Sequence, residues 1–306
     1  VPTGVKVFNW LLTMYRGRIE FHPSMLWSIG FMVTFVIGGM TGVLLAIPSA
    51  DFLMHNTTFL VAHFHNMIIP GVLFGYLAGY MYWFPKAFGF AFDRVWGARS
   101  FWCWFVGFYL AFMPLYILGF KGMPRRMEHY NDPSWQPYLM VAALGAVVVL
   151  CGIGCMVMQL YVSVRDRNLT RDSTGDPWDG RTLEWSTSSP PPAYNFAVLP
   201  EVRDREPFLD MKERGVAYQR PAHYEDIYMP KNSMVGVVMG ALAFVLGFAV
   251  IWYIWWLVIA CGLAMWVALI AKSSDDEAEY MIPAAEVAKI EEARYRALGS
   301  RAGGGT

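Results

Sequence analysis

Two histidines stand two positions apart in a long apolar stretch of this chain. His63 and His65 lie within Thr57–Phe84, which contains no Asp, Glu, Lys or Arg, and an ionisable residue in such a segment is a functional-site candidate. In a helix, at about 100° per residue, positions i and i+2 diverge by roughly 200°. We therefore expect the two imidazoles to point to opposite faces, where each would serve its own metal centre.

This spacing favours haem as the metal centre. A porphyrin supplies four equatorial ligands and needs only one or two from the protein. Zinc or copper would need more ligands than either face of the helix offers. We therefore predict a helix between two haems, with His63 on one iron and His65 on the other. The alternative is that the imidazoles are neutral and hydrogen-bond to neighbouring helices.

The elements that would position these histidines are membrane-spanning helices. The chain is 56% hydrophobic and 16% charged with no net charge, which excludes a disordered or nucleic-acid-binding protein. A spanning helix needs about 20 mostly apolar residues. Met234–Ala271 is about twice that length, so we expect a hairpin of two helices that turns near Tyr253. Four further stretches qualify singly, giving an all-α protein with six spanning helices: Met25–Ile47, Thr57–Phe84, Phe101–Phe120 and Gln136–Val164.

Basic residues near the helix ends predict the orientation. They gather before the first expected helix (Lys6, Arg16, Arg18), after the second, after the fourth and beyond the sixth. These segments share one side, which we expect to be cytoplasmic, and both ends of the chain fall there. Lys6 is thus expected to precede the first helix, and no Lys or carboxylate is expected within any helix. We expect Pro70 to bend the histidine helix.

The loop Lys121–Trp135 breaks this pattern, because it is basic although it lies on the outer side. Its pair Arg125 and Arg126 is suited to carboxylates, which guanidinium groups bind in bidentate fashion. The histidines lie near the same side, so the pair is expected to contact haem propionates. A solvated basic loop is the alternative.

The composition divides the chain into four parts. We expect 1–164 to be part of a haem-binding core and 165–233, rich in Pro, Asp, Arg and Tyr, to pack on its cytoplasmic face. We expect residues 234–272 to form the hairpin, and 273–306 to form a cytoplasmic tail with a short solvated helix.

Several runs match one known family. Val61–Asn66 resembles the tenth-helix signature of subunit I of the haem–copper oxidases. Pro2–Lys6 resembles the end of that family's eighth helix, and Lys121–Arg126 its propionate loop. Asp176–Trp185 and Ser188–Pro192 resemble the segment after the twelfth helix.

The resemblance implies that the first four spanning helices are the ninth to twelfth of that subunit. His63 would be the proximal ligand of the high-spin haem, of o or a type, where dioxygen binds. His65 would be an axial ligand of a low-spin b-type haem, and Arg125 and Arg126 would hold propionates.

Two outer-loop residues, Asp51 and His55, match the propionate and proton-exit region of the family. Cytochrome c oxidases commonly have His-Asp with a bound magnesium at the second position, whereas this chain has His55-Asn56. A full magnesium site is therefore not expected.

The extra hairpin, with its lead-in His223–Asp226 and Met229–Ser233, is similar to cytochrome bo-type ubiquinol oxidases. The implied function is oxidation of ubiquinol and reduction of dioxygen to water, with proton pumping. The protein would act in a bacterial inner membrane, among lipid and with subunits resembling II, III and IV. The alternatives are a cytochrome c oxidase subunit I and, in a different class, a transporter or a structural membrane subunit.

The chain begins at Val1 without Met, and we expect a fragment. By the resemblance, the copper ligands, proton-channel residues and quinol-contacting residues lie upstream. The fragment alone is then not expected to be active.

Overall fold

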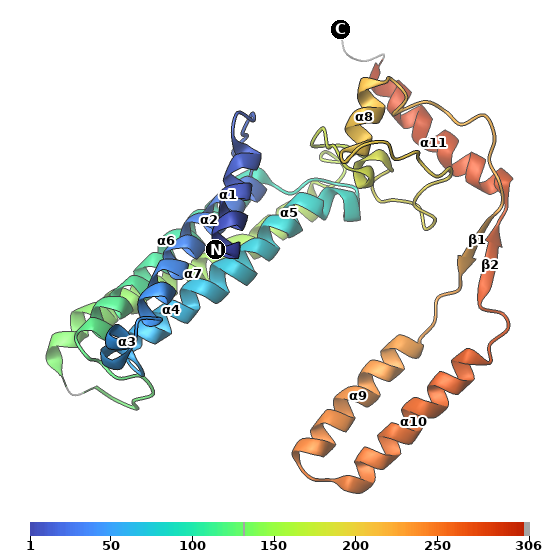
Figure 1. Cartoon of the computed structure of the whole chain (residues 1–306). Helices are drawn as coiled ribbons and strands as arrows, with labels where there is room; N and C mark the ends of the chain where they lie inside the picture. The colour runs from blue at the N-terminus through green and yellow to red at the C-terminus, as the bar shows by residue number, and fades with distance from the viewer. Residues whose placement is uncertain (131, 303–306) are drawn as a thin grey trace. The chain divides into compact units, whose positions relative to one another are not determined.

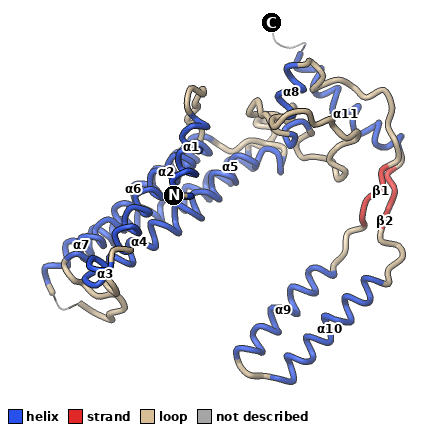
Figure 2. Tube along the Cα trace, viewed as in Figure 1, coloured by secondary structure: helices blue, strands red, loops and turns tan. Residues whose placement is uncertain are grey.

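The computed structural model describes residues 1–130 and 132–302, and these are mostly helical (Figures 1 and 2). Asn131, in the predicted outer loop, and residues 303–306, at the end of the predicted tail, lie outside the described residues. The chain falls into two compact units. The first contains Val1–Gly180 and Glu184–Pro190, and the second contains Arg181–Leu183 and the chain from Pro191 onward.

The first unit is a helical bundle. Several of its helices begin with proline, whose fixed φ suits the first turn and whose missing N–H is not needed there. Its α-helices are α1 (Pro2–Met14), α2 (Pro23–Leu45), α3 (Pro48–Met54), α4 (Thr58–Ile68), α5 (Gly75–Phe88), α6 (Arg94–Phe120) and α7 (Gln136–Arg165). A π-helix, η1 (Ile69–Phe74), joins α4 to α5, and a 3₁₀ turn, η2 (Pro133–Trp135), precedes α7.

Aromatic packing and glycine contacts hold the bundle together. Trp27 of α2 is fully buried and meets Phe74 and Phe101 edge-on, with ring centroids 5.0 and 5.3 Å apart. A Cβ on Gly145 would lie 2.6 Å from the carbonyl carbon of Leu110. Glycine is therefore needed there for α6 and α7 to pack this closely.

The second unit contains a helical hairpin and a small sheet. Helices α9 (Val235–Ile251) and α10 (Trp255–Ser273) run antiparallel (Figure 1). Tyr253 lies in the turn between them with φ 57°, so the predicted position of the turn is confirmed. The other elements are η3 (Leu183–Ser186, at the boundary of the units), α8 (Pro207–Glu213), α11 (Ala284–Ala302), and strands β1 (Ile227–Pro230) and β2 (Glu279–Ile282), which pair antiparallel.

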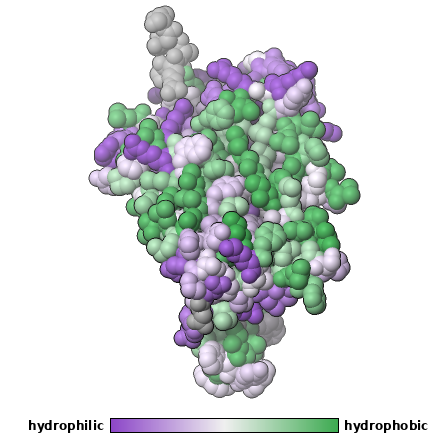
Figure 3. Space-filling model, turned by 90° about the vertical axis from the view of Figure 1, so that its left-hand side faces the viewer, coloured by the Kyte–Doolittle hydropathy of each residue, from purple (hydrophilic) through white to green (hydrophobic). Residues whose placement is uncertain are grey.

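Five helices of the described chain are long and apolar enough to cross a membrane. They correspond to the four single stretches predicted and to α10. The other half of the hairpin, α9, is apolar but only 17 residues long, so the count of six stays a prediction. Apolar side chains cover much of the face shown in Figure 3 (green), which is typical of helices that meet lipid.

Three details of the sequence prediction are wrong. Helices were expected to contain no Lys or carboxylate, but Lys6 lies within α1, Asp51 within α3, and Lys86 within α5, which continues past Phe84. The absence of Lys from the helices was inferred from apolar length alone, which does not detect a 13-residue helix or a helix that extends beyond its apolar part. The fold also includes two strands, so it is mostly rather than entirely helical. Finally, the tail contains β2 and the 19-residue α11, in which Val287 and Glu291 are buried; the helix is neither short nor fully solvated.

Candidate functional site

The histidine helix α4 begins at a well-defined cap. Thr57 is its N-cap residue, and the Thr57 Oγ1 atom accepts a hydrogen bond from the Phe59 N–H at 3.2 Å. Threonine is a favoured cap because its hydroxyl pairs an otherwise unsatisfied helix N–H. The Thr58 N–H donates to the Met123 carbonyl at 2.9 Å. The start of the helix is therefore tied to the loop that follows α6.

His63 is half-buried and faces α2. Its Nδ1 atom lies 2.9 Å from the Thr41 hydroxyl and 3.2 Å from the Gly38 carbonyl oxygen. A carbonyl oxygen can only accept, so Nδ1 carries the hydrogen. In a neutral imidazole, Nε2 then keeps its lone pair. A Cβ on Gly42 would lie 2.8 Å from the His63 Cε1 atom, so glycine is needed there to admit the ring.

His65 has a different set of partners. Its Nδ1 atom lies 2.8 Å from the Val61 carbonyl oxygen, one turn earlier in the same helix. Its ring stacks on Phe112 of α6, with centroids 4.5 Å apart, and also contacts Phe64. The same reasoning places the hydrogen on Nδ1 and leaves the His65 Nε2 atom as an acceptor.

The two imidazoles therefore lie against different helices, and each offers one nitrogen lone pair. Metal-bound histidines characteristically donate their second N–H to a carbonyl or another acceptor, which fixes the tautomer and the ring orientation. Among the described residues, no cluster of three or more His, Cys, Asp or Glu side chains could hold a metal ion. One imidazole on each side matches the donor set of haem, whose porphyrin provides the equatorial nitrogens. The residues present thus fit that cofactor.

The loop that contains Arg125 and Arg126, here called the arginine loop, is attached to the start of the histidine helix. The Arg125 N–H donates to the Asn56 carbonyl at 3.0 Å, and its Nε and Nη2 atoms lie 3.2 and 2.9 Å from Asn56 Oδ1. Thr57 and Pro124 form a β-bridge. Arg126 is exposed and has a left-handed φ of 67°. Both guanidinium groups thus belong to a loop that is held at the N-terminal end of α4.

Asp51 and His55 form a pair of their own. Both belong to α3 and its C-cap, and the His55 Nδ1 atom lies 3.3 Å from Asp51 Oδ2. The imidazole is 59% exposed and the carboxylate 37%. The pair immediately precedes Asn56, so it lies beside the residue that contacts Arg125.

Sequence reasoning missed the π-helix that follows the histidines. In η1 the Gly75 N–H donates to the Pro70 carbonyl, five residues back. Proline has no N–H to offer the residue four positions earlier, and that residue, Asn66, is fully buried. Short π-helical turns within α-helices frequently mark functional sites. The isolated Pro70 was the available signal, and it was interpreted only as a bend.

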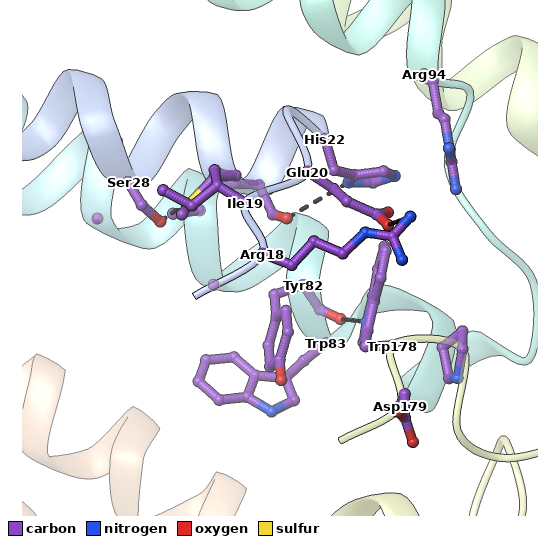
Figure 4. Close-up of a pocket in the computed structure, with 16 residues that line it drawn as sticks. Arg18, Ile19, Glu20, His22, Ser28, Tyr82, Trp83, Arg94, Trp178 and Asp179 are labelled. Carbon is purple, nitrogen blue, oxygen red and sulfur yellow. Dashed lines mark hydrogen bonds and ion pairs between the residues drawn. The ribbon is translucent and has the colours of Figure 1, made fainter. Parts of the chain in front are cut away.

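A second feature of the first unit is a cavity of about 910 Å³ along α5, whose lining does not include His63 or His65 (Figure 4). Its wall includes Tyr82 and Trp178, whose indole N–H donates to the Tyr82 carbonyl at 2.9 Å. His22 also lines it, and its ring meets Trp178 edge-on, with centroids 4.6 Å apart. Burial, followed by the charge of Arg94, lowers the pKa of His22 to about 4. The His22 imidazole is therefore neutral in the folded protein at pH 7.

Comparison with known proteins adds an independent observation. Residues 1–148 match the family model described as cytochrome c and quinol oxidase polypeptide I. The chain is 57% identical, over 99% of its length, to a protein of Acetobacter aceti named ubiquinol oxidase subunit 1. It is 55% identical over 95% to a probable cytochrome c oxidase subunit 1 of Bradyrhizobium diazoefficiens, and 53% identical over 95% to a cytochrome bo(3) ubiquinol oxidase subunit 1 of Buchnera aphidicola.

The chain spans less than half the length of these relatives. It covers 46% of the Acetobacter protein and 44% of each of the other two. Its similarity therefore concerns one part of each relative.

Proposed function

We propose that this chain, whose residues 1–148 match the cytochrome c and quinol oxidase polypeptide I family, forms part of the catalytic subunit of a respiratory ubiquinol oxidase. Such an enzyme oxidises ubiquinol, reduces dioxygen to water and pumps protons. Two of the three relatives described above carry names of ubiquinol oxidases. The third is named a probable cytochrome c oxidase, so a cytochrome c oxidase subunit is the second candidate.

The observation that carries this proposal is the pairing of both histidine Nδ1 atoms with carbonyl oxygens. In this proposal His63 binds the iron of a high-spin haem and His65 that of a low-spin haem. Each Nε2 lone pair would be available to an iron, and each ring would be oriented by the hydrogen bond at its Nδ1 atom. The haems supply the electron transfer and the binding of dioxygen. We also propose that the low-spin haem is of b type, that the high-spin haem is of o or a type, and that copper is bound by residues in another part of the enzyme.

The protein's own residues hold and orient these groups. Because His63 is oriented by α2 and His65 by its own helix, the two imidazoles are fixed by separate contacts. Arg125 and Arg126 are proposed to bind the propionates, since guanidinium and carboxylate groups pair well. Asp51 and His55 are proposed to line the nearby proton-exit region, without a full magnesium site.

The membrane arrangement is proposed from the basic residues. The helices and the relatives indicate a multi-pass membrane protein. We propose six spanning helices in a bacterial inner membrane, with both ends of this chain cytoplasmic. Residues 1–164 would belong to the haem-binding core, and 165–233 would pack on its cytoplasmic face. The segments 234–272 and 273–306 would be an added hairpin and a tail. The partners would be oxidase subunits resembling II, III and IV, with ubiquinol, dioxygen and lipid.

Replacement of each histidine in the assembled enzyme tests the proposal. His65→Ala should abolish the low-spin haem absorption bands, whereas His63→Ala should alter the ligand-binding, high-spin haem. His223→Ala, at an exposed histidine of the second unit, is the matched control and should leave both spectra in place. An unchanged low-spin spectrum in His65→Ala would refute the assignment. Oxygen uptake driven by ubiquinol or by reduced cytochrome c then separates the two candidate functions.

A further inference from the structure

A cluster of hydroxyl groups surrounds the inner nitrogen of His63. Thr41 Oγ1 is at its centre, 2.9 Å from His63 Nδ1, 2.7 Å from the Gly38 carbonyl oxygen and 3.1 Å from the Tyr116 hydroxyl. Tyr116 belongs to α6 and is only 8% exposed. Three helices thus contribute to a single hydrogen-bonded group on the side of His63 that faces away from Nε2.

The hydrogens in this cluster can be assigned from the chemistry of its atoms. The Gly38 carbonyl only accepts, and the Thr41 hydroxyl donates its one hydrogen to it. The two lone pairs of Thr41 Oγ1 are then available to accept from His63 Nδ1–H and from the Tyr116 hydroxyl. Every donor is satisfied, and Thr41 is an acceptor for two competing donors.

We propose that Thr41 is a positioning residue for His63, and that Tyr116 adjusts how strongly Thr41 accepts the Nδ1–H. A stronger hydrogen bond at Nδ1 leaves more electron density on Nε2 and makes the ring a stronger axial ligand. A hydroxyl oxygen that already accepts one hydrogen bond is a weaker acceptor for a second. Thr41 therefore raises the donor strength of His63, and Tyr116 moderates it. This inference rests on the proposed function, because it takes His63 to be an iron ligand.

His65 provides an internal comparison, because its Nδ1 atom is bound by a carbonyl of its own helix. The donor strength of His65 is set within α4, whereas that of His63 depends on side chains of α2 and α6. Substitutions at Thr41 and Tyr116 should therefore affect one haem and leave the other unchanged.

The iron–histidine stretching frequency of the reduced high-spin haem, measured by resonance Raman spectroscopy on the assembled enzyme, tests this role. Thr41→Val keeps the side-chain shape but leaves Nδ1–H with only the 3.2 Å contact to Gly38, so the frequency should fall. Thr41→Ser restores the hydroxyl and should return the frequency toward the original value. Loss of a group that orients a metal ligand typically weakens binding by about 10- to 100-fold, so Thr41→Val should also lose haem more readily.

Tyr116→Phe gives the opposite sign. It removes the competing donor, so Thr41 accepts the His63 hydrogen more fully and the frequency should rise. A frequency that is equal in Thr41→Val and the original protein, or a fall in Tyr116→Phe, would overturn the inference. If Thr41→Val does not assemble, Tyr116→Phe still decides it, because only a competing Tyr116 hydroxyl makes the frequency rise on its removal.

Failure of this inference can be distinguished from failure of the proposed function. If His63→Ala retains an unaltered high-spin haem, the proposed ligand is wrong and both proposals fail. If His63→Ala loses that haem but the Thr41 and Tyr116 variants leave the frequency unchanged, only the positioning role is refuted. The low-spin haem spectrum is the control within each sample and should remain constant.

Discussion

Two adjacent glycines of α2 allow a direct test of how closely that helix must approach the histidine helix. A Cβ on Gly38 would lie 2.8 Å from the Asn66 carbonyl oxygen and 2.9 Å from the Met67 sulfur, whereas a Cβ on Gly39 would have no neighbour within 4 Å. The Met67 side chain can move aside, but the Asn66 oxygen belongs to the backbone. A carbon–oxygen contact needs about 3.4 Å, so Gly38→Ala must separate the helices by roughly 0.6 Å.

The cost of this separation can be estimated by difference. Alanine favours a helix over glycine by about 0.5–1 kcal/mol, and that gain applies equally to Gly38→Ala and Gly39→Ala. Overpacking a close contact costs about 1–3 kcal/mol, and only Gly38→Ala incurs it. We therefore expect Gly38→Ala to be less stable than Gly39→Ala by about 1–3 kcal/mol.

The free energies of unfolding can be compared by SDS titration of both variants in mixed micelles. The Gly38 carbonyl also accepts from His63, at 3.2 Å. A shift of this carbonyl should therefore also change the spectrum of a haem bound at His63 in Gly38→Ala alone. Equal stabilities, or a less stable Gly39→Ala, would refute the inferred close contact.

Three other predictions concern side chains outside the histidine site. The buried Lys86 donates to three backbone carbonyls of the segment after α7, including that of Thr187. Lys86→Met should therefore destabilise the protein by about 2 kcal/mol or more and make that segment more susceptible to limited proteolysis. Unchanged cleavage would contradict this prediction. Burial lowers the pKa of His22 to about 4 from its ordinary 6.5. Between these pH values the unfolded chain binds a proton that the folded chain does not, so the free energy of unfolding should fall as the pH drops from 6.5 toward 4. The melting temperature should therefore be lower at pH 5 than at pH 7.5, and His22→Gln should reduce this difference. Asn56 has a left-handed φ of 59°, which glycine adopts without strain. Asn56→Gly therefore removes both side-chain hydrogen bonds of the partly exposed Arg125 at a cost of about 1 kcal/mol and should raise proteolysis of the loop Lys121–Trp135. A loop that remains equally resistant would argue against this anchor.

The spanning helices were the most predictable part of the fold. Uncharged apolar length located α2, α4 to α5, α6, α7 and the hairpin, because a lipid environment demands it. The same criterion missed α1, which is short and contains Lys6. It also missed the strands β1 and β2, because each has only four residues and its pairing partner is about fifty residues distant.

The divergence of the two imidazoles was predictable from the sequence, but the side chains that contact them were not. The two-residue spacing of His63 and His65 led to the expectation of divergent rings, and the rings lie against different helices. Thr41 and Tyr116 could not be identified from the sequence, because their contact with His63 depends on how three helices pack. Lys86 was likewise invisible as a buried charge, since the carbonyls that satisfy it lie about 90–100 residues further along the chain.

The π-helix Ile69–Phe74 changes the rotation of α5 about the helix axis relative to α4. A π turn contains one more residue than an α turn, so a straight helical wheel drawn through 58–88 is out of phase by about 100° beyond it. Side chains of α5 therefore face neighbours that such a wheel assigns to the adjacent position. Deleting a single residue within η1 could restore regular winding, but it would rotate His63 and His65 by about the same angle relative to α5.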